Sequence, residues 1–142
     1  MFSEKHKTAG VTHPQGFKAA GVRAGIKKSG KLDVALIHTE KEAAVAGVFT
    51  QNLVAAAPVR VSKVVVGTGT AHAIVVNAGC ANACTGEQGL RDAEKMAELA
   101  AKELHCRQDD VVVASTGVIG VNLPMDKMEL GIKNAAQEDR KS

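Results

Sequence analysis

Two stretches of small polar residues contain the groups best suited to chemistry. One is Ser115–Gly120, which reads Ser-Thr-Gly-Val-Ile-Gly and follows a predicted buried strand over Asp110–Ser115. A strand that ends in this way leaves the Gly117 backbone N–H and the Thr116 hydroxyl free to point at an oxygen atom. Fixed donors of this kind form an oxyanion hole, which stabilises the negative charge that develops on a reacting carbonyl. On spacing alone an ordinary turn is the favoured interpretation of this stretch, and the oxyanion hole is the alternative.

The second stretch, Asn77–Gly86, follows a predicted apolar strand over Ala71–Val76 and leads into a helix. Ligands of open α/β sheets bind outside the carboxyl ends of the strands, and a helix N-terminus attracts anions. The stretch lacks the glycine spacing of dinucleotide-binding loops and the Gly-Lys-Ser/Thr ending of a P-loop. A tight turn held by asparagine side chains is therefore the favoured interpretation, with an anion site as the alternative.

The histidines and acidic pairs give no catalytic constellation. His38, His72 and His105 are each isolated in the sequence, so no Ser/His/Asp triad can be assembled from them. Asp126 and Glu129 lie three residues apart in a predicted helix. Acidic residues near a helix N-terminus interact favourably with its dipole, which explains them without a catalytic role.

The three cysteines predict neither a disulfide framework nor a metal site. Their number is odd, and Cys80 and Cys84 are followed by His105 and Cys106 only after more than twenty residues. That spacing is not one of a zinc finger or ribbon. No apolar segment follows the basic N-terminus, so no secretory signal is expected. These features favour a reducing, cytoplasmic setting without a metal.

Composition limits the classes of function further. The 142 residues include 18 basic and 15 acidic residues, 45% hydrophobic residues and 2% aromatic residues. So few aromatic side chains and so even a charge balance argue against nucleic-acid binding through stacked bases. No apolar run has the roughly 18 residues needed to span a membrane. We therefore expect one soluble globular domain over residues 1–142.

The first part of the chain is basic and its secondary structure is weakly indicated. No acidic residue occurs between Lys5 and Leu32, which predicts a solvated loop or, alternatively, a positive rim that attracts carboxylates. Next, Asp33–His38 and Ala44–Thr50 read as a hairpin around a charged turn. The basic residues of the first segment are Lys18, Arg23, Lys27, Lys28 and Lys31.

The rest of the chain reads as alternating strands and helices. After a break at Ala55–Pro58 and a turn at Gly67–Thr70, the clearest element is an amphipathic helix that begins at Thr85. Thr85-x-x-Gln88 predicts a capping box, and apolar residues recur at helical spacing up to Leu104. Pro124 begins a last helix. No closing strand is expected after it, so exposed apolar surface is expected on that helix. The fold class is a layered α/β sheet-and-helix domain.

Four motifs, spread in order between Gly10 and Ile132, carry a resemblance to a known family. Together they resemble the bifunctional ornithine acetyltransferases of arginine biosynthesis, also called glutamate N-acetyltransferases. The motifs are Gly16–Gly21 with Gly25–Lys28, Ala46–Thr50 with Ala56–Pro58, Ile74–Gly79 through Ala81–Gly89, and Ala114–Gly120 with Leu123–Asp126.

The resemblance implies an enzyme made from a self-cleaving precursor, of which this chain looks like the N-terminal part of the α chain. In the family, the N-terminal Thr of the β chain is the nucleophile; it takes an acetyl group from N-acetylornithine and passes it to glutamate. Some members also use acetyl-CoA, and no other cofactor is implied. The family's oxyanion-hole Thr-Gly falls on Thr116 and Gly117. An α2β2 assembly in the cytoplasm is expected.

Two departures from the family pattern keep alternatives open. Cys80 stands where the family commonly has Asn, and the family's nucleophilic Thr and its neighbouring Lys have no counterpart in these 142 residues. The first alternative is therefore a non-catalytic remnant that keeps the fold as a binding or structural chain. The second is a related self-processing hydrolase or aminopeptidase on the same scaffold.

Overall fold

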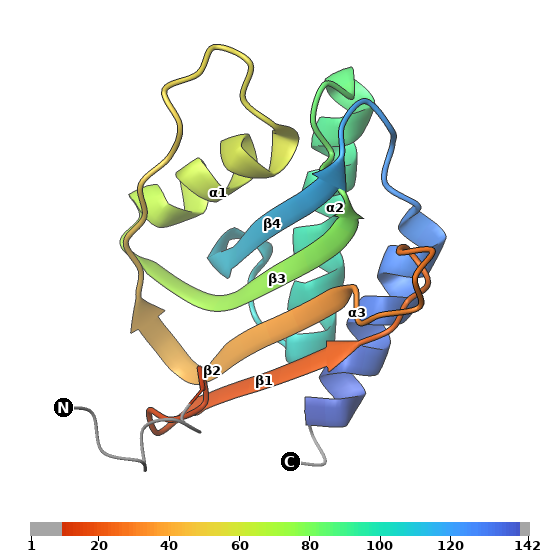
Figure 1. The fold of residues 1–142 in the computed structure, drawn as a ribbon. Helices are drawn as coiled ribbons and strands as arrows, with labels where there is room; N and C mark the ends of the chain where they lie inside the picture. The colour runs from red at the N-terminus through yellow and green to blue at the C-terminus, as the bar shows by residue number, and fades with distance from the viewer. Residues whose placement is uncertain (1–9, 140–142) are drawn as a thin grey trace, which may run out of the picture.

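The computed structural model describes residues 10–139, which form one four-stranded mixed sheet with three α-helices (Figure 1). The strand order is β1-β2-β3-β4; β1 and β2, and β2 and β3, are antiparallel, whereas β3 and β4 are parallel. The layered α/β class is confirmed. The elements are β1 (Phe17–Val22), β2 (Val34–Ala44), α1 (Ala57–Gly67), β3 (Thr70–Cys80), α2 (Gly86–Leu104), the short 3-10 helix η2 (Gln108–Asp110), β4 (Val111–Val118) and α3 (Met125–Asp139).

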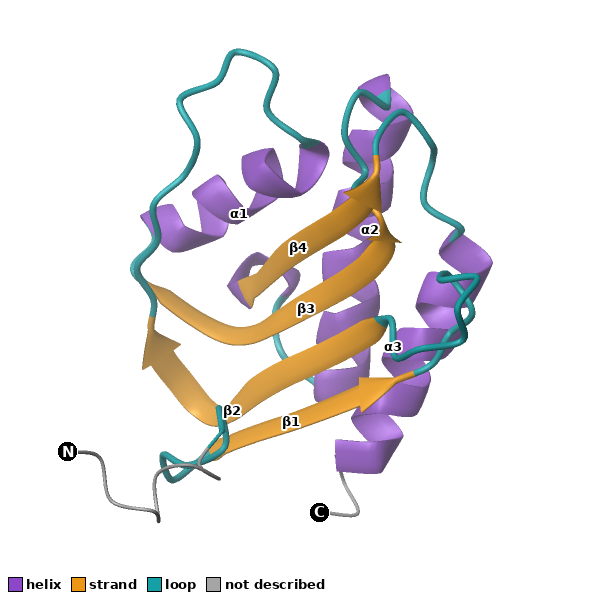
Figure 2. Ribbon diagram, in the orientation of Figure 1, coloured by secondary structure: helices purple, strands orange, loops and turns teal. Residues whose placement is uncertain are grey.

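Helices cover one face of the sheet, and α1 lies against its β4 edge (Figure 2). Helix α2 packs on β3 and β4, and α3 packs on β1 and β2. The core between these layers is built from Leu36, Met96, Met128 and Ile132, which are fully buried, together with many alanines and valines. Small side chains let the helices approach the sheet closely, so a core with few aromatic residues is still well packed.

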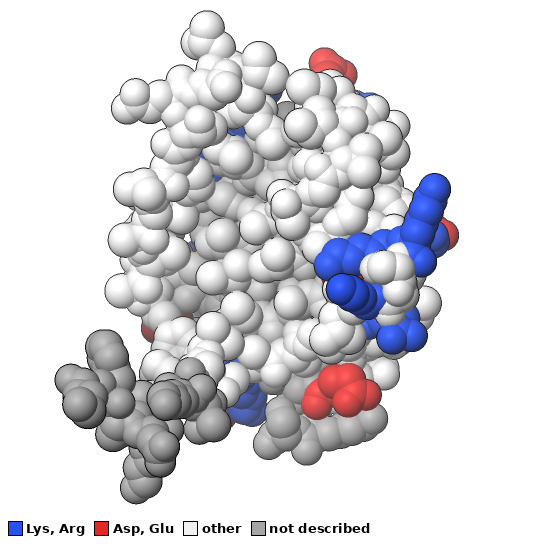
Figure 3. Space-filling model, in the orientation of Figure 1, with Lys and Arg blue, Asp and Glu red and all other residues white. Residues whose placement is uncertain are grey.

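The opposite face of the sheet is apolar and has no covering layer within residues 10–139. The pairing register places Ala35 and Ile37 of β2 beside Val76 and Ile74 of β3, and these beside alternate residues of β4. Figure 3, which views this face, shows almost no charged side chains across the strands. The exposed apolar surface that the sequence predicts for the last helix is found there only at Leu130, which is 54% exposed, and the sheet face carries exposed apolar side chains as well. In α3, Met128, Ile132, Ala135 and Ala136 are buried.

The predicted hairpin over Asp33–Thr50 is wrong. Strand β2 runs without interruption through the charged residues Glu40–Glu42, which were expected to turn, and residues 45–56 form neither strand nor helix. The register shifts between His38 and Ala43, where β2 pairs with β3. The charged residues of β2 lie within this irregularity, and β2 pairs with β3 on both sides of it.

Two elements were missed and two helices are confirmed. Strand β1 was interpreted as a loop, because its alternation is hidden by Lys, Ala and Gly. Helix α1 was missed because Pro58 suggested a break, whereas it occupies the first turn of the helix, where proline is tolerated. Helices α2 and α3 begin close to where the sequence predicts. None of the helices in the described range has the length and apolar character that a membrane span requires.

Candidate functional site

The two polar stretches meet at the end of the sheet where strands β3 and β4 finish. Strands β3 and β4 are parallel, and just before their last residues Ala78 pairs with Thr116 and Gly79 with Gly117. Thr116 and Gly117 are both exposed. Side chains alternate along a strand, so Thr116 extends onto the uncovered apolar face. Ser115, by contrast, faces the helices, with its hydroxyl 3.9 Å from the Met96 sulfur.

The Gly117 backbone N–H points away from β3. At Val113, both main-chain groups are bound by Ser62 of α1: the hydroxyl donates to Val113 O at 2.6 Å and accepts from Val113 N at 3.0 Å. The main-chain groups of every second residue of a strand point to the same side. Counting from Val113 therefore places the Gly117 N–H on the outer edge of β4, which no other described strand covers. The fold leaves this donor beside the Thr116 side chain.

Glycine is required at the paired positions. Gly79 and Gly117 have φ values of 111° and 132°, a region that side chains rarely adopt. A Cβ on Gly117 would lie 2.6 Å from the Cys80 nitrogen, and one on Gly79 would lie 2.9 Å from Ile26 Cγ2. The ends of β3 and β4 thus lie too close together for a side chain at Gly117. The loop that carries Ile26 lies similarly close to Gly79.

The Asn77–Gly86 stretch supports the strand ends. Beyond β3, Ala81 N donates to Val118 O at 2.9 Å, and Gly120 N donates to Ala83 O at 2.8 Å. The Cys80 thiol, which is buried, lies 3.1 Å from Val121 O and donates to it. Cysteine thus supplies a donor at the position where the related family commonly has Asn. This packing agrees with the favoured prediction of a tight turn.

Asparagine side chains hold the stretch from within, as the sequence suggests. Asn77 Nδ2 donates to Cys80 O at 2.9 Å, and Asn82 Nδ2 donates to Gly89 O at 2.8 Å. The capping box is wrong in detail: Thr85 occupies the N-cap position of α2, but its hydroxyl donates to Asn82 Oδ1. Gln88 pairs with Asp92 instead of returning to the Thr85 amide.

A second loop reaches the same edge, held by the Asp33 carboxylate. Buried Asp33 accepts backbone N–H bonds from Ala24 and Ile26, both at 2.6 Å, and from Lys27 at 2.9 Å. Burial alone would raise the pKa of this carboxyl, but the backbone donors outweigh burial and hold the pKa below its usual value. The carboxylate is therefore charged at neutral pH and fixes the segment that contacts Gly79.

Basic side chains surround this loop. Lys127 Nζ of α3 donates to Gly25 O at 2.9 Å, which brings a helix lysine to the loop that also carries Arg23, Lys27 and Lys28. Figure 3 shows the blue side chains gathered at the end of the sheet near this loop. The positive rim that was the less favoured interpretation of the sequence thus lies beside the Gly79–Gly117 pair. Lys18 does not join it, because it pairs with Glu40 at 3.5 Å.

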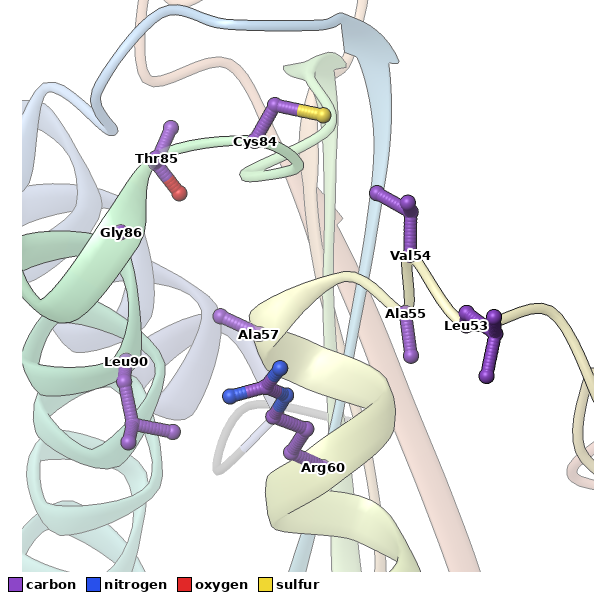
Figure 4. Close-up of a pocket in the computed structure, with 9 residues that line it drawn as sticks. All are labelled: Leu53, Val54, Ala55, Ala57, Arg60, Cys84, Thr85, Gly86 and Leu90. Atoms are coloured by element: carbon purple, nitrogen blue, oxygen red, sulfur yellow. The ribbon is translucent and has the colours of Figure 1, made fainter.

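A small cavity lies on the other side of the polar stretch, between the first turns of α1 and α2. Its volume is about 290 Å³. Figure 4 shows the Arg60 side chain extending into the space between α1 and Leu90, with Cys84 and Thr85 on the loop beyond. Its walls also include Leu53 and other apolar residues of the segment before α1. The cavity contains one cation and no described carboxylate.

The histidines that are isolated in the sequence line one cavity in the fold. His38 of β2, His72 of β3 and His105 after α2 border a cavity of about 590 Å³ with Cys106. Burial and the nearby Asp110 raise the pKa of the Cys106 thiol. This cavity lies by the first residues of β4, at the far end from Thr116. Within residues 10–139, no three His, Cys, Asp or Glu side chains are placed to hold a metal ion.

The sequence missed one residue that shapes the candidate site, Ser62, and it gave Gly79 and Asn82 no separate roles within the Asn77–Gly86 stretch. Ser62 lies in a helix that was not predicted. For Asn82 a signal was present, since it lies three residues before the N-cap of a predicted helix, where a polar side chain can bond the first turn. For Gly79 the signal was weaker, because only pairing with β4 shows why a side chain is excluded.

Comparison with known proteins identifies relatives over nearly the whole chain. The model of the ArgJ family matches residues 18–142. The chain is 56% identical over 129 residues to the arginine biosynthesis bifunctional protein ArgJ of Symbiobacterium thermophilum, which covers 89% of this chain and 32% of that protein. It is 47% identical over 131 residues to the mitochondrial ArgJ protein of Dictyostelium discoideum, covering 89% and 29% of the two chains. The chain thus spans about a third of the length of these relatives.

Solved structures show the same fold. The ornithine acetyltransferase of Mycobacterium tuberculosis, solved in complex with ornithine, superposes with a TM-score of 0.88 at 48% identity, over 91% of this chain and 70% of that chain. The ArgJ protein of Bacillus halodurans superposes with a TM-score of 0.86 at 41% identity, over 92% and 70% of the two chains. From the family model, the sequence identities and the shared fold, we conclude that this chain belongs to the ArgJ family.

Proposed function

We propose that this chain supplies the oxyanion hole of an acetyltransferase that moves an acetyl group from N-acetylornithine to glutamate. The observation that carries the proposal is the outward Gly117 N–H beside the exposed Thr116 side chain at the end of β4. The Gly117 N–H is fixed by the sheet and needs no rearrangement to meet a charge that develops in front of it, and the Thr116 hydroxyl lies on the exposed side chain next to it. Relatives named ArgJ are bifunctional proteins of arginine biosynthesis, which supports this chemistry.

The proposed reaction has two acyl-transfer steps. In the first, the Thr hydroxyl at the start of a β chain, activated by its own α-amino group, attacks the acetyl carbonyl of N-acetylornithine. The carbonyl oxygen becomes an oxyanion, which accepts hydrogen bonds from Thr116 and Gly117; ornithine leaves with a proton on its amine, and an acetyl ester remains. In the second step the amine of glutamate attacks the ester and a second oxyanion forms at the same donors. The bond to the Thr oxygen then breaks, the proton lost by the amine returns to that oxygen, and N-acetylglutamate leaves the free Thr hydroxyl. Acetyl-CoA is proposed as an additional acetyl donor, and no metal is required.

The β chain of the same precursor is the proposed partner, in an α2β2 assembly in the cytoplasm. The uncovered sheet face supports such a partner, since Ile74 and Val118 on it are 36% and 59% exposed. Large apolar patches of this kind mark interaction surfaces. Thr116 lies at one end of the face, so a chain that covers it can bring its own N-terminal residue close to the donors.

The basic loop at the same edge fits substrates that carry carboxylates. Glutamate and N-acetylornithine both do, and clustered cations raise the local concentration of anions. Arg23, Lys28 and Lys31 are exposed in this loop. Their proposed role is attraction of substrate, with the chemistry left to the β chain and the two donors.

The experiment is acetyl transfer by this chain assembled with its Thr-initiated β chain. Thr116→Ala removes one donor and is expected to lower kcat by about 10²–10³-fold. Thr12→Ala, an exposed threonine near the start of the described range, is the matched control and should leave kcat unchanged. Near-normal turnover by Thr116→Ala would remove Thr116 from the role. Absence of acetyl transfer by the unmodified assembly would favour a non-catalytic binding chain, and peptide hydrolysis in its place would favour a related self-processing hydrolase.

A further inference from the structure

We propose that Asn82 is a positioning residue of the oxyanion hole, which holds the backbone that follows Gly117 in place from the interior of the protein. The proposal rests on the function proposed above. It assigns to the buried Asn82 of the Asn77–Gly86 stretch a part in the reaction beyond holding a tight turn.

Asn82 connects the loop after β3 to two helices. Its side chain is fully buried; Nδ2 donates to Gly89 O in α2 at 2.8 Å, and Oδ1 accepts from the Thr85 hydroxyl at 2.7 Å. Its backbone carbonyl accepts from Ala57 N, at the start of α1, at 3.3 Å. Each polar atom of the Asn82 side chain has a partner, and loss of either bond leaves an unpaired group in the core, so the side chain is expected to keep one position.

Two backbone features accommodate the buried Asn82 side chain: the conformation of Asn82 itself and the glycine at position 89. Asn82 has a left-handed φ of 49°, which Asn adopts more readily than most residues. At Gly89, an added Cβ would overlap the Thr85 hydroxyl and lie 2.5 Å from Asn82 Oδ1. Helix α2 thus carries a glycine in its second turn, at a cost in helix stability, where the Asn82–Thr85 pair enters.

The residues on either side of Asn82 form backbone hydrogen bonds with residues 118–120, which follow the candidate donors. Ala81 N donates to Val118 O, and Ala83 O accepts from Gly120 N. Asn82 therefore lies between two backbone bonds that fix Val118 and Gly120, and Val118 directly follows Gly117. A shift of the Asn82 side chain moves both bonds, and with them the direction of the Gly117 N–H.

Small displacements of a donor have large effects on rate. A misplacement of about 1 Å in a catalytic group lowers turnover by up to about 10²-fold, whereas substrate binding depends mainly on groups elsewhere. The expected signature of a positioning role is therefore a lower kcat with an unchanged KM. A residue that only stabilises the fold lowers the melting temperature and leaves kcat of the folded enzyme unchanged.

The test uses hydroxyl deletions at matched threonines in the assembled enzyme. Thr85→Val removes the bond to Asn82 Oδ1 without changing side-chain shape and is expected to lower kcat about tenfold or more, with KM within about twofold. Thr85→Ser keeps the hydroxyl and should restore kcat. The control is Thr70→Val at the other end of β3, which removes an exposed hydroxyl bond of 2.6 Å to Glu42 and should leave kcat unchanged.

Combination with Thr116→Ala separates this proposal from the function on which it rests. If Thr85 acts through the oxyanion hole, the double variant loses less than the product of the two single effects. A normal kcat in Thr85→Val, or fully multiplicative effects, overturns the positioning role while Thr116→Ala still supports the function. A normal kcat in Thr116→Ala overturns both. If Thr85→Val does not fold, Thr85→Ala, which removes the same hydroxyl with a smaller side chain, is assayed in the same way.

Discussion

Gly79 and Gly117 face each other across the parallel ladder of β3 and β4, and both have positive φ values, of 111° and 132°. The two strands end side by side with no side chain between them. As a result the loops that follow, 81–85 and 118–120, can exchange backbone hydrogen bonds. The proposed oxyanion hole is thus built on a backbone-to-backbone contact, and its exposure to solvent does not make it mobile.

Gly117→Ala is expected to disturb this contact severely. The new Cβ would lie 2.6 Å from the Cys80 nitrogen, and overpacking of this kind costs about 1–3 kcal/mol in addition to backbone strain. The free energy of unfolding from urea titration measures the loss. Gly120→Ala is the control, because Gly120 has a φ of 80° with no atom within 4 Å of the added Cβ. Equal losses in the two variants would show that strain alone matters.

Ser62→Ala tests how α1 holds the edge of β4. The Ser62 hydroxyl bonds both main-chain groups of Val113, and all of these atoms are buried. Alanine leaves a buried N–H and a buried carbonyl without partners, so we expect a loss of about 1–3 kcal/mol in the free energy of unfolding. Ser29→Ala, at an exposed position in the β1–β2 loop, should change it by less than about 0.5 kcal/mol.

A loss at Ser62 no larger than that at Ser29 would contradict the assignment of α1 as the partner of this edge. The same variant in the assembled enzyme reports on the site, because the register of β4 determines which way the Gly117 N–H points.

The sequence predicts those parts of the fold whose apolar residues recur at regular spacing or whose motif is contiguous. Helix α2 was predicted from its apolar spacing, and the candidate donors Thr116 and Gly117 came from a motif that is contiguous in the chain. Strand β1 and helix α1 were missed because long-range contacts decide them: β1 is a strand through its pairing with β2, and Pro58 is compatible with helix only because it lies in the first turn. The roles of Asn82 and Gly79 depend on partners that only folding brings close, namely Gly89 for Asn82 and Gly117 for Gly79.

Helix α3 approaches the sheet through Gly131, and Gly131→Ala is expected to destabilise the protein. The added Cβ would lie 2.8 Å from both Ala24 Cβ and Val34 Cγ2. The helix gains about 0.5–1 kcal/mol from replacing glycine, but overpacking costs about 1–3 kcal/mol, so a net loss is predicted from thermal unfolding. Gly67→Ala at the end of α1 meets no atom within 4 Å and should be neutral or slightly stabilising. A stabilised Gly131→Ala would mean that α3 can move away from β2 without cost.

Asp33→Asn is expected to lower stability in a way that depends on pH. The pKa of Asp33 is lower in the folded chain than in the unfolded chain, because backbone donors at residues 24–27 outweigh the effect of burial. A carboxylate with a lowered pKa contributes stability that is fully present above the unfolded value, about 3.9, and is lost as the pH falls through the folded value. At neutral pH the variant should lose about 1.5–3 kcal/mol, since its amide cannot replace the charged acceptor of three N–H bonds.

The difference in unfolding free energy between Asp33→Asn and the unmodified chain should therefore shrink as the pH is lowered below about 4. Urea titrations of both proteins at pH 7, 5 and 3 measure this difference. Glu129→Gln, which removes an exposed carboxylate of α3, is the control and should show a small difference at each pH. A difference for Asp33→Asn that stays constant across this range would mean that its charge contributes nothing to the hold on the loop, and that shape alone keeps Ile26 against Gly79.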